Sequence, residues 1–284
     1  MIERGSKRFF APSLLPALAG ILNLTEDSFS DGGKYSNMEK ALSRGEQLLR
    51  EGAFLLDVGA ESTRPGAQEI PEEAEKEKIL SFLLPFRKKF PESIISIDTR
   101  KSTVARAALE AGADIINDVS GLRFDPEMKN TIARYGCPLI LMHSRGTPEN
   151  MQKELHLDYG EDFLKTFEAE VEAMVDNALS AGIPKENIIL DPGLGFAKTP
   201  EQNWLLIRKC RYLRKRFSLP LFYGYSRKSF LGYGAGRSLT LEERESANLA
   251  VLGFLAEEGA DFCRIHDVKS AKDFLTVRNY LLQK

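Results

Sequence analysis

The apolar residues of the chain gather in eight short runs, and most runs end in a polar residue together with glycine or proline. Within each run Ile, Leu and Val follow one another with little alternation, which is typical of strands buried on both faces, as in a parallel sheet. We therefore predict eight strands, over residues 17–24, 53–60, 93–99, 114–121, 138–143, 187–193, 220–226 and 261–267.

The stretches between these runs carry the period of amphipathic helices, with apolar residues at i, i+3, i+4 and i+7. The clearest of these stretches are 38–49, 163–179 and 247–255. Several helical stretches end in a glycine just before the next apolar run, and glycine tolerates the left-handed backbone that closes a helix. These glycines are Gly52, Gly112, Gly182 and Gly259.

Eight strands that alternate with helices predict a closed parallel (β/α)8 barrel, in the α/β class. An open doubly wound sheet is the alternative that fits the same order of elements. No linker or change of composition divides the chain, so we expect a single domain over 1–284, in which 1–16 form an N-terminal extension. The connections near 27–36, 62–71 and 144–158 are long for simple turns, and long loops tend to be functional.

A polar residue lies at the carboxyl end of every predicted strand, where barrel enzymes place their functional groups. Turns and helix N-caps also favour Asp, Asn and Ser, so one such residue alone indicates little. Eight in order predict a barrel mouth that binds a polar ligand. They are Asn23, Asp57, Asp98, Asn117, His143, Asp191, Ser226 and His266.

The loops after the first two strands add chemistry to these strand ends. The first loop holds Asp27 and Asp31, which can reach a metal-bound phosphate, and a pair of glycines that lets the loop close. The second loop holds Arg64 on a backbone stiffened by Pro65. A guanidinium there can clamp a carboxylate or a phosphate through two parallel hydrogen bonds.

Cations follow the last two strands. Arg227 and Lys228 come just past the seventh strand, and Arg264 and His266 lie at the end of the eighth. In barrels of this kind the loops after these two strands commonly bind phosphate, because cations and helix N-terminal amides converge there. Arg227 also fits a solvated surface charge, whereas Lys228 and Arg264 have apolar neighbours.

Eight motifs, in one order, resemble those of the dihydropteroate synthase family. They are GILNLTEDSFSDGGKY, DVGAESTRPGA, SIDT, INDVSG, LMH with GTPENMQ, LDPGLGF, SRKSF and RIHDV, and they span about residues 19–268. ESTRPGA and SRKSF are the most specific of them. The resemblance implies a transferase of folate biosynthesis that joins 4-aminobenzoate to (7,8-dihydropterin-6-yl)methyl diphosphate. Departure of diphosphate would leave a cation delocalised over the pterin, and 7,8-dihydropteroate would be the product.

The resemblance also implies roles for single residues. The pterin-binding residues are Asp98, Asn117, Met142, Asp191 and Lys228. The catalytic residues are Lys228, Asp98, Asp191, Arg64, Asp27 and Asp31. For Met142, and for Phe196 in the next group, the residues alone would favour core packing.

The other substrate groups are assigned in the same way. The diphosphate would be bound by Asn23, Thr63, Arg264 and His266, with Mg²⁺ as cofactor and Asn23 as its protein ligand. A single protein ligand is acceptable for Mg²⁺, which commonly takes few protein groups plus substrate phosphates and waters. The 4-aminobenzoate would be bound by Thr63, Arg64, Pro65, Phe196, Ser226 and Lys228. Closure of the first loop would exclude water, which otherwise captures the cation.

Two places depart from the family's usual motifs. GFAK, over 195–198, replaces GFGK, so Ala197 stands where the family usually has glycine. We expect Ala197 to be tolerated if its backbone φ is negative. MHSRGTP replaces the common MHMQGTP, so Ser144 and Arg145 change the polarity of a loop near the mouth.

Charge and cysteine content exclude several other classes of protein. Lys and Arg number 39 against 41 acids, a net charge of -2, which argues against a nucleic-acid partner. Three cysteines without paired spacing favour neither a disulfide framework nor a zinc site, and fit the cytoplasm. Prolines interrupt the N-terminal segment, and no apolar run reaches the length of a membrane span, so we expect neither a signal peptide nor a membrane partner. The resemblance implies a homodimer, with the apolar stripe of 163–179 as a candidate interface.

Other functions fit the sequence less well. A methyltetrahydrofolate methyltransferase barrel could share the acids and the asparagine of strands three, four and six, but it should lack STRPG and SRKSF. A non-catalytic relative would be revealed by loss of Asp191, Lys228, Arg264 or His266, and all four are present. A metal hydrolase is disfavoured because the three histidines have no metal-ligand spacing.

Overall fold

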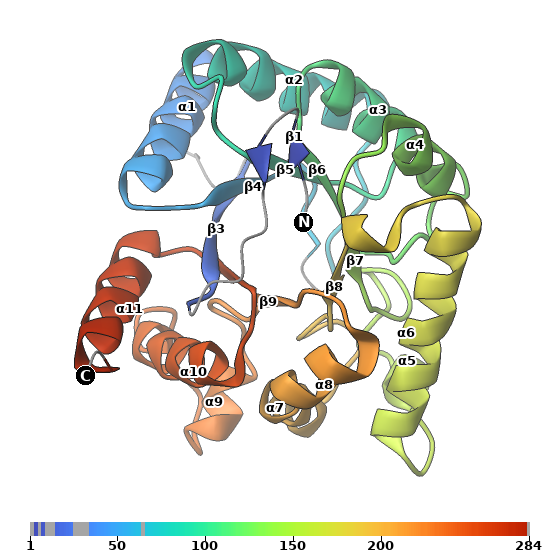
Figure 1. The fold of residues 1–284 in the computed structure, drawn as a ribbon, viewed down its shortest axis with the longest axis vertical. Coiled ribbons are helices and arrows are strands. Elements are labelled where there is room, and N and C mark those ends of the chain that lie inside the picture. The colour runs from blue at the N-terminus through green and yellow to red at the C-terminus, as the bar shows by residue number, and fades with distance from the viewer. Residues whose placement is uncertain (1–2, 5–6, 9–14, 25–33, 64–65, 283–284) are drawn as a thin grey trace.

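The chain folds as a parallel barrel inside a ring of helices (Figure 1). The computed structural model describes residues 3–4, 7–8, 15–24, 34–63 and 66–282. In this part of the chain no helix is both long enough and apolar enough to cross a membrane.

Each of the eight predicted apolar runs contains one strand of the barrel. The strands are β3 (Ala17–Asn23), β4 (Leu55–Gly59), β5 (Ile95–Asp98), β6 (Ile115–Asp118), β7 (Leu139–Met142), β8 (Ile188–Asp191), β9 (Phe222–Gly224) and β10 (Phe262–Ile265). They pair in parallel in the order β8-β7-β6-β5-β4-β3-β10-β9. The ends of this order meet through a bridge between Leu190 and Leu221, so the barrel is nearly closed and the open-sheet alternative is wrong.

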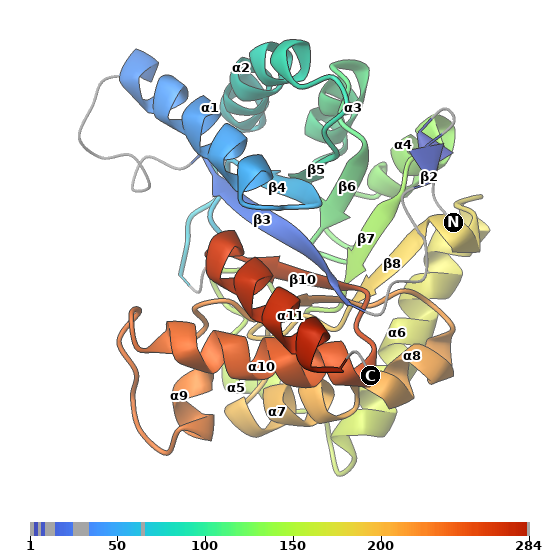
Figure 2. The same cartoon turned by 60° about the vertical axis from the view of Figure 1, so that its left-hand side comes forward.

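Helices follow the strands as predicted. They are α1 (Lys34–Arg50), α2 (Glu72–Lys89), α3 (Ser102–Glu110), α4 (Met128–Tyr135), α5 (Glu154–Leu157), α6 (Phe163–Ser180), α7 (Pro200–Arg208), α8 (Cys210–Phe217), α9 (Leu231–Gly234), α10 (Arg244–Glu258) and α11 (Val268–Leu282), with a 3-10 turn, η2, at Lys185–Asn187. The helix-closing glycines named above all have positive φ, between 81° and 101°. α10 and α11 lie side by side, with α11 against β3 (Figure 2).

A short antiparallel pair precedes the barrel. β1 (Glu3–Arg4) pairs with β2 (Lys7–Arg8), with Glu3 opposite Arg8. The sequence did not predict these two-residue strands, because neither contains an apolar residue.

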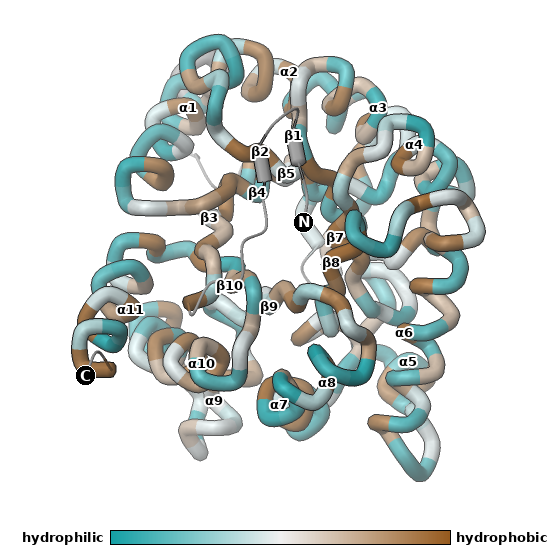
Figure 3. The backbone as a smooth tube through the Cα atoms, viewed as in Figure 1, coloured by the Kyte–Doolittle hydropathy of each residue, from teal (hydrophilic) through white to brown (hydrophobic). Residues whose placement is uncertain are grey.

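The barrel has two apolar cores, one on each face of the sheet. The larger core packs the outer face of the strands against the helices, and Figure 3 shows the hydrophobic strands at the centre of the more mixed helices. The smaller core fills the inside of the barrel. It comprises Ala19, Leu55, Ile115, Ile140, Ile189, Phe222 and Phe262. Every strand except β5 thus contributes one apolar residue to a plug near the end at which the strands begin.

The apolar stripe of α6 is buried in the chain's own core. Phe167 and Val171 are fully buried, and Met174 and Val175 are less than a tenth exposed. The side chain of Asp162 caps the helix by accepting a hydrogen bond from the Lys165 amide at 3.1 Å. The stripe therefore does not supply the subunit interface for which the sequence made it a candidate.

Candidate active site

A charged layer lies directly above the apolar plug. Side chains alternate between the two faces of a strand, so the residue two positions after an inward apolar residue also points inward. This places Asp57 above Leu55, Asn117 above Ile115, Asp191 above Ile189 and Arg264 above Phe262. These four strands thus bring polar groups into one mouth.

Arg264 and two acids form the centre of this layer. The Arg264 guanidinium donates from Nε to Asp57 Oδ2 at 2.5 Å and from its terminal nitrogen to Asp98 Oδ2 at 3.4 Å. Asn117 donates from Nδ2 to both Asp57 oxygens, at 3.3 and 3.2 Å. Asp57 is fully buried, so it orients two residues that the sequence assigned to substrate.

Asp98 is the acid most affected by this environment. Burial, reinforced by the negative charge of Asp57, raises the pKa of Asp98 to about 8, although Arg264 opposes the shift. Such a carboxyl carries a proton at neutral pH and can donate a hydrogen bond.

Asn117 presents an unused acceptor to the mouth. Its Oδ1 atom is buried and has no hydrogen-bond partner among the described residues, while its Nδ2 is engaged by Asp57. A buried acceptor without a donor costs free energy, and native proteins seldom leave one unless a ligand or water supplies the partner. Asn117 therefore points to a ligand with an N–H or O–H group.

Asp191 ends β8 and is fixed by the turn that follows it. Its Oδ1 accepts the Gly193 amide at 2.7 Å. Gly193 has φ 69°, and a Cβ at this position would collide with the carbonyl oxygen of His143. Burial raises the pKa of Asp191 to about 6, against the attraction of the nearby Lys228.

Lys228 reaches across the mouth from the loop after β9. Its ammonium donates to the Leu194 carbonyl and lies 4.5 Å from the centre of the Phe196 ring. Burial lowers the pKa of Lys228 to about 8, although Asp191 opposes the shift. Its neighbour Arg227 turns outward and pairs with Glu245 at 2.6 Å, as a surface charge would.

Ser226 and His266 lie together at the ends of the last two strands. His266 Nδ1 is 2.9 Å from the Ser226 hydroxyl oxygen, which also accepts the His266 amide at 3.2 Å. Arg44 of α1 donates to the His266 carbonyl at 2.9 Å. The Ser226 hydroxyl therefore belongs to the His266 side of the mouth, where the sequence expected diphosphate.

The loops after β3 and β4 complete the rim. Asp27, Asp31, Arg64 and Pro65 lie outside the described residues. The remaining rim residues, Asn23, Thr63 and Met142, are in the structure: the first two are half-buried at the mouth, and Met142 is buried at the end of β7 beside Asp191.

The start of the second loop is anchored by a buried ion-pair cluster. Glu61 pairs with Arg100 at 2.5 Å and with Lys101 at 2.7 Å. Lys101 also pairs with Glu75 of α2 at 2.8 Å. The backbone that leads into Thr63 is thereby fixed.

Three results go beyond the sequence prediction or contradict it. Asp57 was only one of eight strand ends and received no role, yet it holds both Arg264 and Asn117; counting two residues on from Leu55 would have placed it inside the barrel. The condition under which Ala197 was expected to be tolerated, a negative φ, is not met, since its φ is 51° in the left-handed region. His143 was also grouped with the strand ends, but it follows the inward Met142 and points outward to α6, where its ring lies 4.7 Å from that of Phe167.

One of two surface hollows lies at the barrel mouth, where the polar strand ends meet. A cavity of about 290 Å³ opens beside Phe196, between the loops after β6 and β7. A larger hollow of about 610 Å³ lies at the opposite end, where the strands begin. Both of its arginines are already paired with acids, Arg214 with Asp261 at 2.9 Å and Arg211 with Glu258 at 3.2 Å, so we place the active site at the mouth.

Known proteins resemble the chain over nearly its whole length. Residues 19–266 match the pterin binding enzyme family. The chain is 41% identical over 262 residues to the dihydropteroate synthase of Synechocystis, covering 92% of this chain and 89% of that protein. It is 40% identical over 270 residues to the folic acid synthesis protein fol1 of Pneumocystis carinii, and spans 36% of that longer protein. The solved dihydropteroate synthase of Xanthomonas albilineans with 4-aminobenzoic acid is 35% identical, with a TM-score of 0.86 over 95% of this chain and 94% of that one.

Proposed function

Since the chain belongs to the pterin-binding enzyme family and to the dihydropteroate synthases within it, we propose that its barrel mouth couples a dihydropterin to 4-aminobenzoate through a pterin-stabilised cation. The enzyme is a transferase of folate biosynthesis. The carbon–oxygen bond between the pterin methylene and diphosphate breaks with both electrons leaving on oxygen. The aminobenzoate nitrogen then forms the new bond to that carbon and releases one proton.

The unpaired Oδ1 of Asn117, between two acids with raised pKa, is the observation that carries this proposal. The pterin's amino-pyrimidinone edge offers neighbouring N–H donors and mixed ring atoms. Asp191, ionised above pH of about 6, accepts the paired donors, and Asn117 accepts another. Asp98, protonated near neutrality, donates to a ring acceptor. Two carboxyls with separated pKa values can thus serve opposite hydrogen-bonding roles in one site.

The same residues suit the charge that develops in the reaction. Positive charge on the pterin would be stabilised by the Asp191 carboxylate, which is ionised above pH of about 6. Met142 and Phe196 wall the ring and the path of the aminobenzoate. Lys228 contacts the pterin's acceptors and stands beside that path.

The leaving diphosphate is assigned to the opposite side of the mouth. Arg264 and His266 supply a cation and a hydrogen-bond donor there, with Asn23 and Thr63 from the first two strands and their loops. Arg264 is already oriented by Asp57, so little ordering is needed when the anion binds. Asp27 and Asp31 would close the first loop and keep water from the cation.

Mg²⁺ is the cofactor we propose, with Asn23 as its protein ligand. Asn23 ends β3 half-buried, and its carboxamide bonds no described side chain, which leaves a hard oxygen donor for the ion. The ion would neutralise charge on the leaving diphosphate.

The 4-aminobenzoate site is proposed to combine Phe196 and Lys228 with the second loop. Thr63, Arg64 and Pro65 would form its outer wall, and the guanidinium would hold the carboxylate. Ser226 would line the boundary with the diphosphate side, because its hydroxyl is held by His266.

Assembly and compartment are part of the proposal. Family resemblance supports a homodimer, which sedimentation at several protein concentrations would test. The three cysteines are free and buried, which supports a cytoplasmic protein.

One assay tests the activity directly. Purified protein is given Mg²⁺, the dihydropterin diphosphate and 4-aminobenzoate, and released diphosphate is measured with and without the aminobenzoate. We expect release that depends on the aminobenzoate, and its absence would contradict the proposed function. Aryl sulfonamides should compete with 4-aminobenzoate in the same assay, and failure to compete at any dose would contradict the assignment of Arg64 and Ser226.

A further inference from the structure

The turn after β8 sets the shape of the proposed site. Residues 193–197 supply the amide that fixes Asp191, the Leu194 carbonyl that holds Lys228, and the Phe196 ring beside its ammonium. A shift of this turn would therefore move groups on both substrates at once.

This turn has an unusual backbone. Gly193, Gly195 and Ala197 all have positive φ, at 69°, 78° and 51°. The two glycines adopt this conformation without steric cost, but alanine does not, because its Cβ crowds the backbone there. Something outside the turn must keep Ala197 in the left-handed region.

Lys198 holds the turn from below. Its buried ammonium lies 3.1 Å from the Gly193 carbonyl oxygen, 3.0 Å from that of Phe196 and 3.2 Å from that of His143. It also lies 3.0 Å from His143 Nδ1. One buried cation thus ties both ends of the turn to the end of β7.

His143 carries this contact on to α6. The ionised Glu170 carboxylate can only accept, so His143 Nε2 carries the hydrogen that reaches Glu170 Oε2 at 2.8 Å, and Nδ1 accepts from Lys198, whose pKa burial lowers well below its usual value. Burial and the charge of Lys198 lower the pKa of His143 to about 3, so the ring is neutral. Despite burial, hydrogen bonds from His143 and Arg145 lower the pKa of Glu170 to about 2, so it is ionised.

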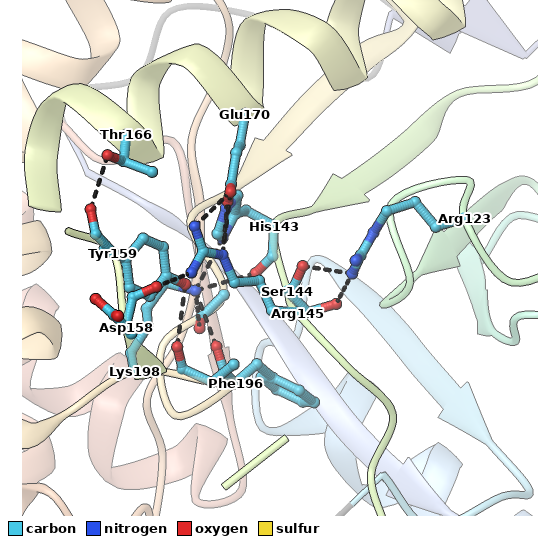
Figure 4. A network of polar contacts seen from close by, with 12 residues as sticks. Arg123, His143, Ser144, Arg145, Asp158, Tyr159, Thr166, Glu170, Phe196 and Lys198 are labelled. Atoms are coloured by element: carbon cyan, nitrogen blue, oxygen red, sulfur yellow. Dashed lines mark hydrogen bonds and ion pairs between the residues drawn. The ribbon is translucent and has the colours of Figure 1, made fainter. Parts of the chain in front are cut away.

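Arg145 and Tyr159 connect Glu170 back to the turn over residues 193–197. Arg145 pairs with Glu170 at 2.5 Å, donates to the Asp158 carbonyl, and stacks with its guanidinium carbon 3.6 Å from the centre of the Tyr159 ring. The Tyr159 hydroxyl donates to the Ala197 carbonyl at 3.0 Å. Figure 4 shows these side chains as one connected network. It runs from Ala197 through Tyr159, Arg145, Glu170 and His143 to Lys198, the residue next to its start.

We propose that Arg145 and Tyr159 are positioning residues for the transferase reaction, which hold Ala197 in its left-handed conformation and so keep Phe196 and Lys228 in place. Arg145 and Ala197, at which the sequence departs from the usual family motifs, both belong to this circuit. Ser144, the third such residue, follows His143 in the chain, and its hydroxyl accepts from Arg123 of the neighbouring loop at 2.8 Å. The inference rests on the proposed function, since it concerns the same turn and substrates.

The test is a double-mutant cycle of Tyr159→Phe and Ala197→Gly. Tyr159→Phe removes only the hydroxyl that holds the Ala197 carbonyl, and we expect kcat/KM for 4-aminobenzoate to fall about fivefold. In the Ala197→Gly background the left-handed conformation has no steric cost, so Tyr159→Phe should lower kcat/KM by less than about twofold. Arg145→Lys, which keeps the charge but loses the stacked two-pronged contact, should behave like Tyr159→Phe.

Controls separate positioning from loss of stability. Tyr135→Phe removes a comparable hydroxyl, which donates to Glu110 at 2.6 Å on the outer surface, and should leave kcat/KM unchanged. If Tyr159→Phe has the same effect in both backgrounds, or changes only Tm, the positioning role is overturned. Wild-type protein measured beside the variants keeps the two proposals apart: an inactive wild type refutes the function, whereas an active wild type with unaffected variants refutes only this inference.

Discussion

Two polar clusters, one inside the barrel and one between the barrel wall and α6, differ in how completely their groups are hydrogen-bonded. Inside the barrel, Asp57 and Asp98 share the Arg264 guanidinium, Asp191 has Lys228 as its main attractive charge, and Asn117 retains an unpaired acceptor. Outside it, Lys198, His143, Glu170 and Arg145 form a circuit in which each charged group has a partner.

This difference indicates that the inner cluster binds a ligand, whereas the outer cluster stabilises the backbone. Buried groups that pair fully stabilise one backbone geometry, whereas buried groups that remain incompletely paired cost stability and persist where a ligand completes them. The inner cluster is therefore expected to control turnover, and substitutions in it should not lower the stability of the fold. The outer cluster is expected to control folding and the shape of the turn that serves the inner one.

The largest effect should come from the inner cluster. Asp191→Asn and Lys228→Ala each remove charge that acts on the reacting pterin, and we expect turnover to fall about a thousandfold. Circular dichroism should show an unchanged fold. Asp176→Asn, on the exposed side of α6, is the matched control and should keep full activity. Normal turnover by the Asp191→Asn variant would contradict the assignment of turnover to the inner cluster.

The next effect should come from the outer cluster and should appear in stability. Lys198→Met keeps the length of the side chain but removes the donor to the carbonyls of Phe196 and His143. We expect the free energy of unfolding to fall by about 3 kcal/mol in urea denaturation. Lys165→Met, at an exposed site of α6, should change it by less than about 0.5 kcal/mol. Equal losses in the two variants would mean that the circuit does not support the fold.

Asp98→Asn should raise stability while it lowers activity. A carboxyl whose pKa is raised on folding binds its proton more tightly in the folded chain, so wild-type stability falls as pH rises from about 4 to about 8. The amide cannot ionise and escapes this loss. We expect the variant to be more stable than wild type at pH 8 and nearly equal to it at pH 4, as measured by thermal unfolding at the two pH values. A gain that is larger at pH 4 would contradict the raised pKa.

The smallest effect should be that of Ala197→Gly. Glycine removes the steric cost of φ 51° but gains freedom in the unfolded chain, and we expect a net increase in unfolding free energy of about 0.5 kcal/mol. Ala181→Gly, at a helix end with φ -80°, should instead lower it. If Ala197→Gly destabilises the protein as much as Ala181→Gly does, the left-handed backbone stores no strain.

The barrel could be predicted from the sequence because the signals for its strands and helix ends lie in short local stretches of residues. Runs of buried residues located all eight strands, and glycine at positions such as Gly52 marked where helices end. The inward residues Asp191 and Arg264 were found because both lie at or near strand ends.

The features that could not be predicted from the sequence depend on contacts between residues that are far apart in the chain. The role of Asp57 follows from the meeting of β4, β6 and β10, which are far apart in the chain. The direction of His143 follows from its being one residue past the inward Met142. The positive φ of Ala197 follows from contacts with α6 and with the loop before it, and nothing in GFAK itself reveals them.

The strands β8 and β9 meet at a seam, where the two ends of the strand order close the barrel, and residues of the mouth help to hold this seam together. Main-chain pairing there is limited to the region of Leu190, whose amide donates to the Pro220 carbonyl at 2.9 Å, and the bridge to Leu221. Above this bridge, Lys228 from the loop after β9 donates to the Leu194 carbonyl in the loop after β8, so a residue proposed to bind substrate also connects the two strands. A ligand that contacts both Asp191 and Lys228 would connect them a second time. Hydrogen exchange at the Leu190 amide should then slow when the mouth is filled, so that the weakest joint of the barrel reports on occupancy.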